Sequence, residues 1–208
     1  MTCVVGLRFD NCVYIGADSF LSDSMTGLKL RYPKKVFQVN DFIIGVCGSV
    51  RLLQTVAHKF QVAPKFVGQD IYDYVYSTFF DCLINCLRQE KCLMEADGIE
   101  VLPNSQMIIG IEDKIFVVQP DLSIFEPEED FVCIGSGEFH SQGVMEILKG
   151  TDLTPAEKIQ TAIEKTSKHV VSVNEDIIIL TNNNKEEEEP ELIEDTIEST
   201  KTINDRGE

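Results

Sequence analysis

The sequence comprises 208 residues, of which 43% are hydrophobic and 25% charged, and its formal net charge at neutral pH is −17. This length and composition are typical of a soluble globular protein with one sizeable core. The acidic balance argues against nucleic acid or an anionic membrane as a partner bound through a basic face. We expect neither a membrane span nor a signal peptide, because no apolar run reaches roughly 18 residues and no basic segment precedes one.

The first predicted element begins at the second residue, where Thr2 leads directly into an apolar, strand-like run. A second such run follows Asp10 and Asn11, two residue types that tolerate the left-handed turn of a tight hairpin. With a two-residue turn at these positions, Cys3 faces Asp18 on the partner strand. The hairpin therefore places a carboxylate beside Thr2.

A second hairpin is predicted from the runs 35–39 and 42–48, which flank Asn40-Asp41. The same pairing arithmetic sets Lys35 opposite Val46, with Gly48 just beyond the pair. Both hairpins are apolar on two faces, and such strands belong in a sheet that is covered on each side.

Helical and strand patterns then alternate in blocks. Ser49 can cap a helix with apolar residues up to Phe60, and a longer helical pattern runs from Ile71 to Cys86. The next block predicts strands over residues 106–112, 114–119 and 123–127.

The last third of the chain repeats this order. A strand within 130–138 ends in the turn Gly-Ser-Gly, and a helix is expected over 138–148. Thr-Pro-Ala-Glu at 154–157 is a capping box with proline at the first helical position. Runs of apolar residues at 170–173 and 176–180 predict two closing strands.

Strands, two helices, strands, two helices and strands indicate an α+β fold. The pattern predicts a four-layer αββα sandwich, in which two antiparallel sheets are stacked and flanked by helices. We expect this domain to span residues 1–184. Residues 185–208 are predicted to form a disordered acidic tail, because the segment is rich in glutamate and poor in aromatic residues.

The two hairpins suggest a chemistry for Thr2. A threonine hydroxyl is a weak nucleophile without a base. If Met1 is removed, the α-amine of Thr2, with a pKa of about 8, is a far better base than an ordinary lysine. A nearby Lys35, held by Asp18, would lower the pKa of that amine further, and the Gly48 amide could stabilise an oxyanion.

These residues resemble a known family. TCVVGLRFDNCVYIGADS, KKVFQVNDFIIGVCGS and CIGSGEFHSQGV are similar to the threonine-peptidase subunits of the proteasome β type and to the related bacterial peptidase subunit. The resemblance covers roughly residues 2–180 and implies the fold of the N-terminal-nucleophile (Ntn) hydrolases. By motif it implies that Thr2 is the nucleophile, Asp18 the acidic partner, Lys35 the catalytic lysine, Gly48 the oxyanion glycine and Ser136 a supporting serine.

Two positions of the family pattern are ambiguous. Lys34 is an alternative to Lys35, which we prefer because it has the strand parity of Phe37 and Val39. The family's Asp-x-x-Ser-Gly run at the end of the last helix has no full counterpart. Glu164 and Ser167 have the spacing, but the glycine is missing.

The resemblance implies a cytoplasmic threonine endopeptidase that forms a homo-oligomeric ring, acts on peptides or unfolded proteins, and could work with an AAA+ unfoldase. Two alternatives remain: a catalytically silent structural or assembly protein of the same fold, and an Ntn amidase acting on non-peptide substrates. We expect no cofactor and no metal. The seven cysteines are scattered and fit a reducing compartment, and His58, His140 and His169 suggest neither a metal site nor a catalytic triad.

Overall fold

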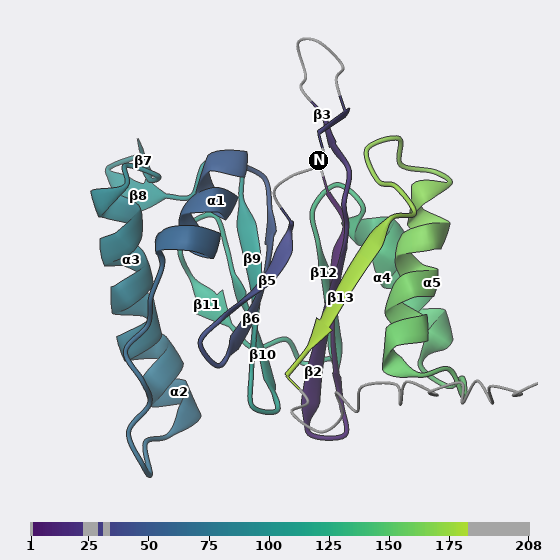
Figure 1. The fold of residues 1–208 in the computed structure, drawn as a ribbon, viewed down its shortest axis with the longest axis horizontal. Helices are drawn as coiled ribbons and strands as arrows, with labels where there is room; N and C mark the ends of the chain where they lie inside the picture. Colours follow the sequence, from purple (N-terminus) through teal and green to yellow (C-terminus); the bar gives the residue numbers. More distant parts are fainter. Residues whose placement is uncertain (1, 23–28, 31–33, 183–208) are drawn as a thin grey trace, which may run out of the picture.

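The computed structural model describes residues 2–22, 29–30 and 34–182. Two antiparallel sheets dominate it (Figure 1). The four-stranded sheet has the order β12-β1-β2-β13, with bounds Phe131–Ile134, Val4–Phe9, Cys12–Asp18 and Ile177–Thr181. The five-stranded sheet has the order β11-β10-β9-β6-β5, with bounds Ile124–Phe125, Lys114–Val118, Gln106–Ile111, Phe42–Cys47 and Val36–Val39.

Both predicted hairpin registers are confirmed. Asp10 and Asn11 have φ values of 48° and 60°, which are the left-handed values of a two-residue turn. In β1 and β2, Phe9 pairs with Cys12 and Val4 with Ala17, so the next pair towards the N-terminus is Cys3 with Asp18. In the second hairpin the Val46 amide donates to the Lys35 carbonyl over 2.9 Å.

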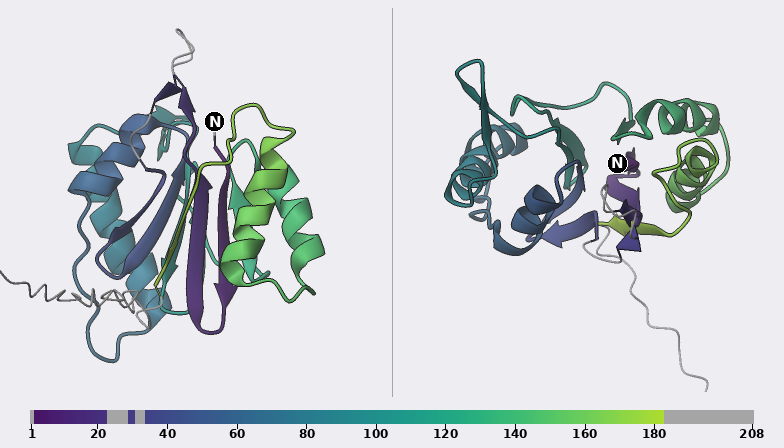
Figure 2. Two further views of the ribbon diagram at one scale, coloured as in Figure 1. Left: turned by 45° about the vertical axis from the view of Figure 1, so that its right-hand side comes forward. Right: turned by 90° about the horizontal axis from the view of Figure 1, so that it is seen from above.

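The helices lie on the outer sides of the two sheets (Figures 1 and 2). On the five-stranded sheet these are α1 (Val50–Lys59), α2 (Ile71–Asp73), a π-helical segment η1 (Tyr74–Phe79) and α3 (Phe80–Gln89). On the four-stranded sheet they are α4 (Glu138–Leu148) and α5 (Pro155–Ser167). The predicted caps are confirmed: Ser49 accepts from the Leu52 amide, and Thr154 and Glu157 form the capping box.

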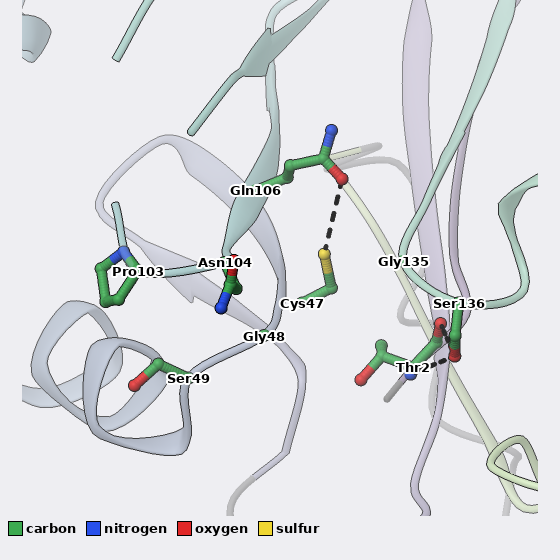
Figure 3. A pocket seen from close by; sticks show the side chains of 9 residues that line it. All are labelled: Thr2, Cys47, Gly48, Ser49, Pro103, Asn104, Gln106, Gly135 and Ser136. Atoms are coloured by element: carbon green, nitrogen blue, oxygen red, sulfur yellow. Dashed lines mark hydrogen bonds between the residues drawn. The ribbon is translucent and has the colours of Figure 1, made fainter. Parts of the chain in front are cut away.

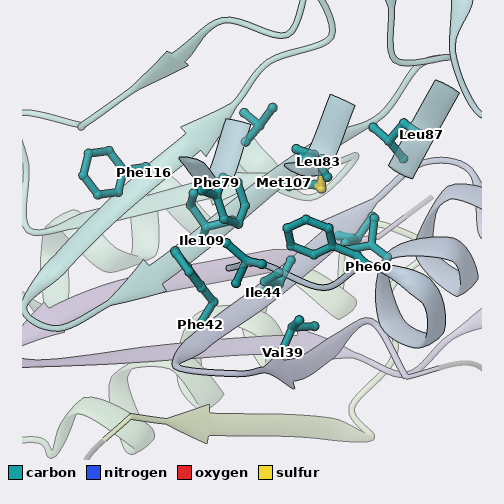
Figure 4. Packing of buried hydrophobic residues seen from close by; sticks show 14 of the residues in the cluster. Val39, Phe42, Ile44, Phe60, Phe79, Leu83, Leu87, Met107, Ile109 and Phe116 are labelled. Carbon is teal, nitrogen blue, oxygen red and sulfur yellow. The ribbon is translucent and has the colours of Figure 1, made fainter. Parts of the chain in front are cut away.

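Three apolar clusters hold these elements together. One fills the space between the five-stranded sheet and its helices and contains Phe42, Phe60, Phe79 and Phe116 (Figure 4). A second joins the facing sides of the two sheets. A third lies between the four-stranded sheet and α4 and α5. Each sheet therefore has an apolar cluster on both of its faces, which explains why the strands are apolar on two sides.

Two short strand pairs were not predicted: β3 (Leu21–Ser22) with β4 (Lys29–Leu30), and β7 (Met94–Ala96) with β8 (Ile99–Val101). The predicted strand over 170–173 is wrong. There the Val170 amide donates to the Thr166 carbonyl, and the Val173 amide donates to the Val170 carbonyl, so the segment forms turns.

The predicted domain end at 184 and the acidic tail 185–208 lie outside the described residues. Among the described residues, no helix is long and apolar enough to cross a membrane.

Candidate active site

A cavity of about 520 Å³ opens where the two sheets meet at one end of the molecule. One wall comes from the four-stranded sheet and consists of Thr2, just before β1, with Gly135 and Ser136, just after β12. The opposite wall comes from the five-stranded sheet. It consists of the end of β6 and the two residues after it, Cys47 to Ser49, and of the start of β9 and the residues before it, Pro103, Asn104 and Gln106 (Figure 3). Segments far apart in the sequence thus form one pocket, and Thr2 lies at its edge.

The backbone of Thr2 is held by the side chain of Ser136, which is itself exposed. The Thr2 nitrogen donates to the Ser136 hydroxyl oxygen over 3.0 Å, and that hydroxyl lies 3.3 Å from the Thr2 carbonyl oxygen. Thr2 is only 3% exposed, yet its side chain points into the cavity, toward the wall that Gly48 and Ser49 form (Figure 3). The hydroxyl is therefore presented to whatever occupies the cavity.

The Gly-Ser-Gly turn is shaped around the Thr2 carbonyl. Gly135 has a φ of +94°, and a Cβ at this position would lie 2.3 Å from the Thr2 oxygen. The Gly137 amide donates to the same oxygen over 3.2 Å. A side chain at 135 would thus clash with the residue that the turn holds, which explains the glycine.

Asp18 and Lys35 form a buried ion pair beneath Thr2. The Lys35 ammonium donates to both carboxylate oxygens of Asp18 over 3.0 Å. Lys35 is 2% exposed and Asp18 is 1% exposed. Asp18 also accepts from the amides of Cys3, over 2.8 Å, and Phe20, over 3.1 Å. The carboxylate therefore ties the lysine to the backbone directly after Thr2.

Burial lowers the pKa of Lys35, while the charge of Asp18 and its hydrogen bond raise it. The net effect is a lowered pKa for Lys35, and the contact with Asp18 favours the charged form of the lysine against its burial. That positive charge is the kind that stabilises an alkoxide or depresses the pKa of a neighbouring amine.

Of the two candidate lysines, Lys34 is exposed and Lys35 is buried against Asp18. The parity argument for Lys35 was wrong, although the residue itself reaches the site. Val39 belongs to the cluster under the helices, and Phe37 packs against it. Lys35 instead precedes the strand, and its side chain reaches Asp18 of the other sheet.

Gly48, on the opposite wall of the cavity, also has a conformation that requires glycine. Its φ is +103°, and a Cβ would lie 2.3 Å from the Asn104 carbonyl oxygen and 2.4 Å from the Ser105 hydroxyl oxygen. That hydroxyl also accepts from the Ser49 amide over 2.9 Å. The backbone at 48–49 is thus fixed in position beside the cavity, as a preorganised donor must be.

The thiols near the site are poor nucleophiles. Burial raises the pKa of Cys47, which lines the cavity, and of Cys3 to about 11 each, so both thiols are protonated at neutral pH. The Cys47 thiol points to the Gln106 amide oxygen, 3.9 Å away.

Sequence reasoning missed Ser172. Its hydroxyl lies 3.0 Å from that of Ser136, so a chain of hydrogen bonds runs from the Thr2 nitrogen through Ser136 to Ser172. Ser172 is 3% exposed. Ser167, the candidate chosen by spacing, bonds instead to the carbonyl of Glu164 and the carboxylate of Glu175.

The described residues contain no group of three or more histidine, cysteine or acidic side chains that could hold a metal ion. His140 and His169 are exposed and stack with ring centroids 6.0 Å apart.

The sequence and the fold both have relatives among known proteins. No protein-family model matches the sequence. The chain is 24% identical over 179 residues to "ATP-dependent protease subunit HslV" of Caldicellulosiruptor saccharolyticus, an alignment that covers 85% of this chain and 95% of that protein.

Solved structures share the fold. BPH of Thiobacillus denitrificans matches with a TM-score of 0.68 at 18% identity, covering 86% of this chain and 96% of that one. HslV of Trypanosoma brucei matches with a TM-score of 0.59 at 17% identity, covering 86% and 98%. Anbu of Hyphomicrobium sp. strain MC1, as a Gly-1 mutant, matches with a TM-score of 0.62 at 17% identity, covering 86% and 80%. The resemblance to proteasome-like threonine peptidases is confirmed over most of the chain.

Proposed function

We propose that this homologue of HslV is a threonine peptidase of the Ntn-hydrolase type, with Thr2 as its nucleophile. The observation that carries the proposal is the position of Thr2. Its nitrogen is held by Ser136, its hydroxyl faces a cavity, and a buried Asp18–Lys35 pair anchors the next residue. The two sheets with helices on their outer sides support an αββα sandwich as the scaffold.

In the proposed mechanism, removal of Met1 converts the Thr2 amide nitrogen into an amine. An amide nitrogen only donates, whereas a neutral amine can accept the proton of the adjacent hydroxyl. The Thr2 oxygen then attacks the substrate carbonyl, and the amine passes the proton to the leaving amine. Water hydrolyses the resulting ester and restores the threonine.

The other residues have supporting roles in this proposal. Lys35, held by Asp18, stabilises the developing alkoxide. The backbone at Gly48 supplies the oxyanion donor. Ser136 orders the amine through the bonds described above.

The similarity to HslV also supports a proposal about how this chain assembles and which partners it has. The relative's name describes a subunit of an ATP-dependent protease. We propose that this chain acts in the cytoplasm as a homo-oligomeric ring, on peptides or unfolded proteins, and that an AAA+ ATPase is a possible kind of partner.

The mass of the intact protein, measured before and after treatment with a peptide epoxyketone, tests the proposal. An epoxyketone reacts with both the hydroxyl and the amine of an N-terminal threonine. We expect the loss of one methionine and a single adduct. A protein that retains Met1 and forms no adduct would instead favour the silent structural alternative. An adduct without peptide cleavage, combined with cleavage of acyl amides, would favour the amidase.

The hydrogen-bond chain through Ser172 makes a second prediction. Ser172→Ala removes the bond that orients the Ser136 hydroxyl, and we expect the rate of epoxyketone labelling to fall about tenfold. The free energy of unfolding should fall by only about 1 kcal/mol. Ser167→Ala is the matched control, because the Ser167 hydroxyl bonds to the Glu164 carbonyl and takes no part in the chain through Ser136. The labelling rate of this variant should equal that of the wild type. Equal rates for both variants would remove Ser172 from the mechanism.

A further inference from the structure

A second pocket lies between the four-stranded sheet and helices α4 and α5. Its volume is about 290 Å³, and it shares no lining residue with the Thr2 cavity. Three of its walls are apolar and buried: Leu7 of β1, Phe131 of β12 and Met145 of α4. Phe9, which is 50% exposed, lies at its edge.

Three cations line this pocket, and two of them are neutralised. Arg8 forms ion pairs with Glu126 over 3.0 Å and with Asp130 over 2.7 Å. Lys149 is paired with two other carboxylates, the nearer at 2.6 Å. These two charges are therefore already satisfied by the protein.

The third cation, Lys158 of α5, is different. The residue is 8% exposed, and within the described part of the chain its ammonium has neither a hydrogen bond nor a carboxylate within 4.0 Å. No side-chain nitrogen sealed from solvent in those residues lacks a partner, so the Lys158 ammonium reaches accessible space, and Lys158 lines this pocket. A lysine whose stem is buried and whose ammonium has no carboxylate partner can give an anionic ligand in this pocket a charge-assisted hydrogen bond.

The residues that line the pocket indicate which kind of ligand would pair with Lys158. One negative charge complements Lys158, because Arg8 and Lys149 are already paired with carboxylates. A multiply charged anion would exceed that single charge and would be repelled by the net charge of the chain. The buried walls of Leu7, Phe131 and Met145 favour an apolar body. We propose that this pocket binds a small apolar monocarboxylate, with its carboxylate on Lys158 and its hydrocarbon part against these three residues.

Two sources share this chemistry: a free medium-chain carboxylic acid, and the carboxyl end of a peptide with an apolar last residue. Octanoate represents the first and N-acetyl-leucine the second. Octylamine, with the same hydrocarbon body and the opposite charge, controls for non-specific apolar binding. The proposal does not depend on the peptidase function, because binding is measured without catalysis.

The test is calorimetric titration of the full-length protein with each probe. We expect one of the two carboxylates to bind the wild type, and Lys158→Met to weaken that binding about tenfold or more, as the loss of a charged hydrogen bond should. Lys165→Met is the matched control, since Lys165 is an exposed lysine of the same helix, and it should bind like the wild type. Absence of carboxylate binding, equal binding to Lys158→Met, or equal binding of octylamine would each overturn the proposal.

A measurement on the wild type covers the case in which Lys158→Met fails to fold. Lysine acetylation by a water-soluble reagent is followed at each site by peptide mass spectrometry. The carboxylate that binds should slow the modification of Lys158 several-fold and leave that of Lys165 unchanged. Equal rates at Lys158 with and without the carboxylates would contradict the inference.

Discussion

Thr2→Ala is expected to abolish peptide hydrolysis, lowering kcat at least about 10³-fold, while the protein remains folded. The variant removes the proposed nucleophile, but it keeps the backbone nitrogen that donates to Ser136 and the carbonyl that accepts from the Gly137 amide. The hydroxyl faces the cavity and not the core, so the free energy of unfolding should change by less than about 1 kcal/mol. Cleavage of a mixed peptide library, followed by mass spectrometry, measures the activity without assuming a sequence preference.

Thr2→Ser is the control for this experiment. It keeps an attacking oxygen and should keep measurable hydrolysis together with the epoxyketone adduct. If Thr2→Ala cleaves peptides as fast as the wild type, another group is responsible. Cys47→Ala then becomes the next variant to measure, because Cys47 lines the same cavity.

The part of the site that could be predicted depends on local rules. Asp10-Asn11 permits only a narrow set of turns, and the turn fixes the register that brings Asp18 to the backbone at Cys3. The capping residues Ser49 and Thr154 likewise predict where α1 and α5 begin. In each case a few neighbouring residues determine the geometry.

The Asp18–Lys35 contact has a different origin. It joins the two sheets, and no pairing pattern within one hairpin can place a side chain of one sheet against the other. The contact was expected from chemistry, since an amine base beside Thr2 is helped by a cation that a carboxylate holds, and the resemblance to a known family implied the same two residues. Strand parity gave a wrong reason for preferring Lys35 to Lys34. Long-range packing decides the position of Lys35, which is why its burial is visible only in the folded chain.

Ser172 was missed because its segment, Val-Val-Ser-Val, has the β-branched composition of a strand. The end of α5 and the start of β13 instead constrain it to turns, and these direct the serine toward Ser136. The β7–β8 hairpin, in contrast, carries a usable signal. Asp97-Gly98 is a typical hairpin turn, with φ values of 51° and 80°.

Lys35→Met is expected to remove activity and also to destabilise the fold. The substitution deletes the positive charge beside the proposed nucleophile, and it leaves the Asp18 carboxylate buried without its counter-ion. Breaking a buried ion pair in this way typically costs about 3–5 kcal/mol. Urea unfolding measures the free energy of unfolding, and epoxyketone labelling at a temperature where the variant is still folded measures the reactivity of Thr2.

The double variant Asp18→Asn, Lys35→Met separates the two effects. Asparagine is neutral and can still accept from the Cys3 amide, as Asp18 does over 2.8 Å, so the uncompensated charge disappears. The double variant should therefore recover much of the stability that Lys35→Met loses. It should not recover labelling, because the cation is still absent. Labelling that returns together with stability would mean that Lys35 acts only through the fold, and that the Thr2 amine needs no neighbouring positive charge.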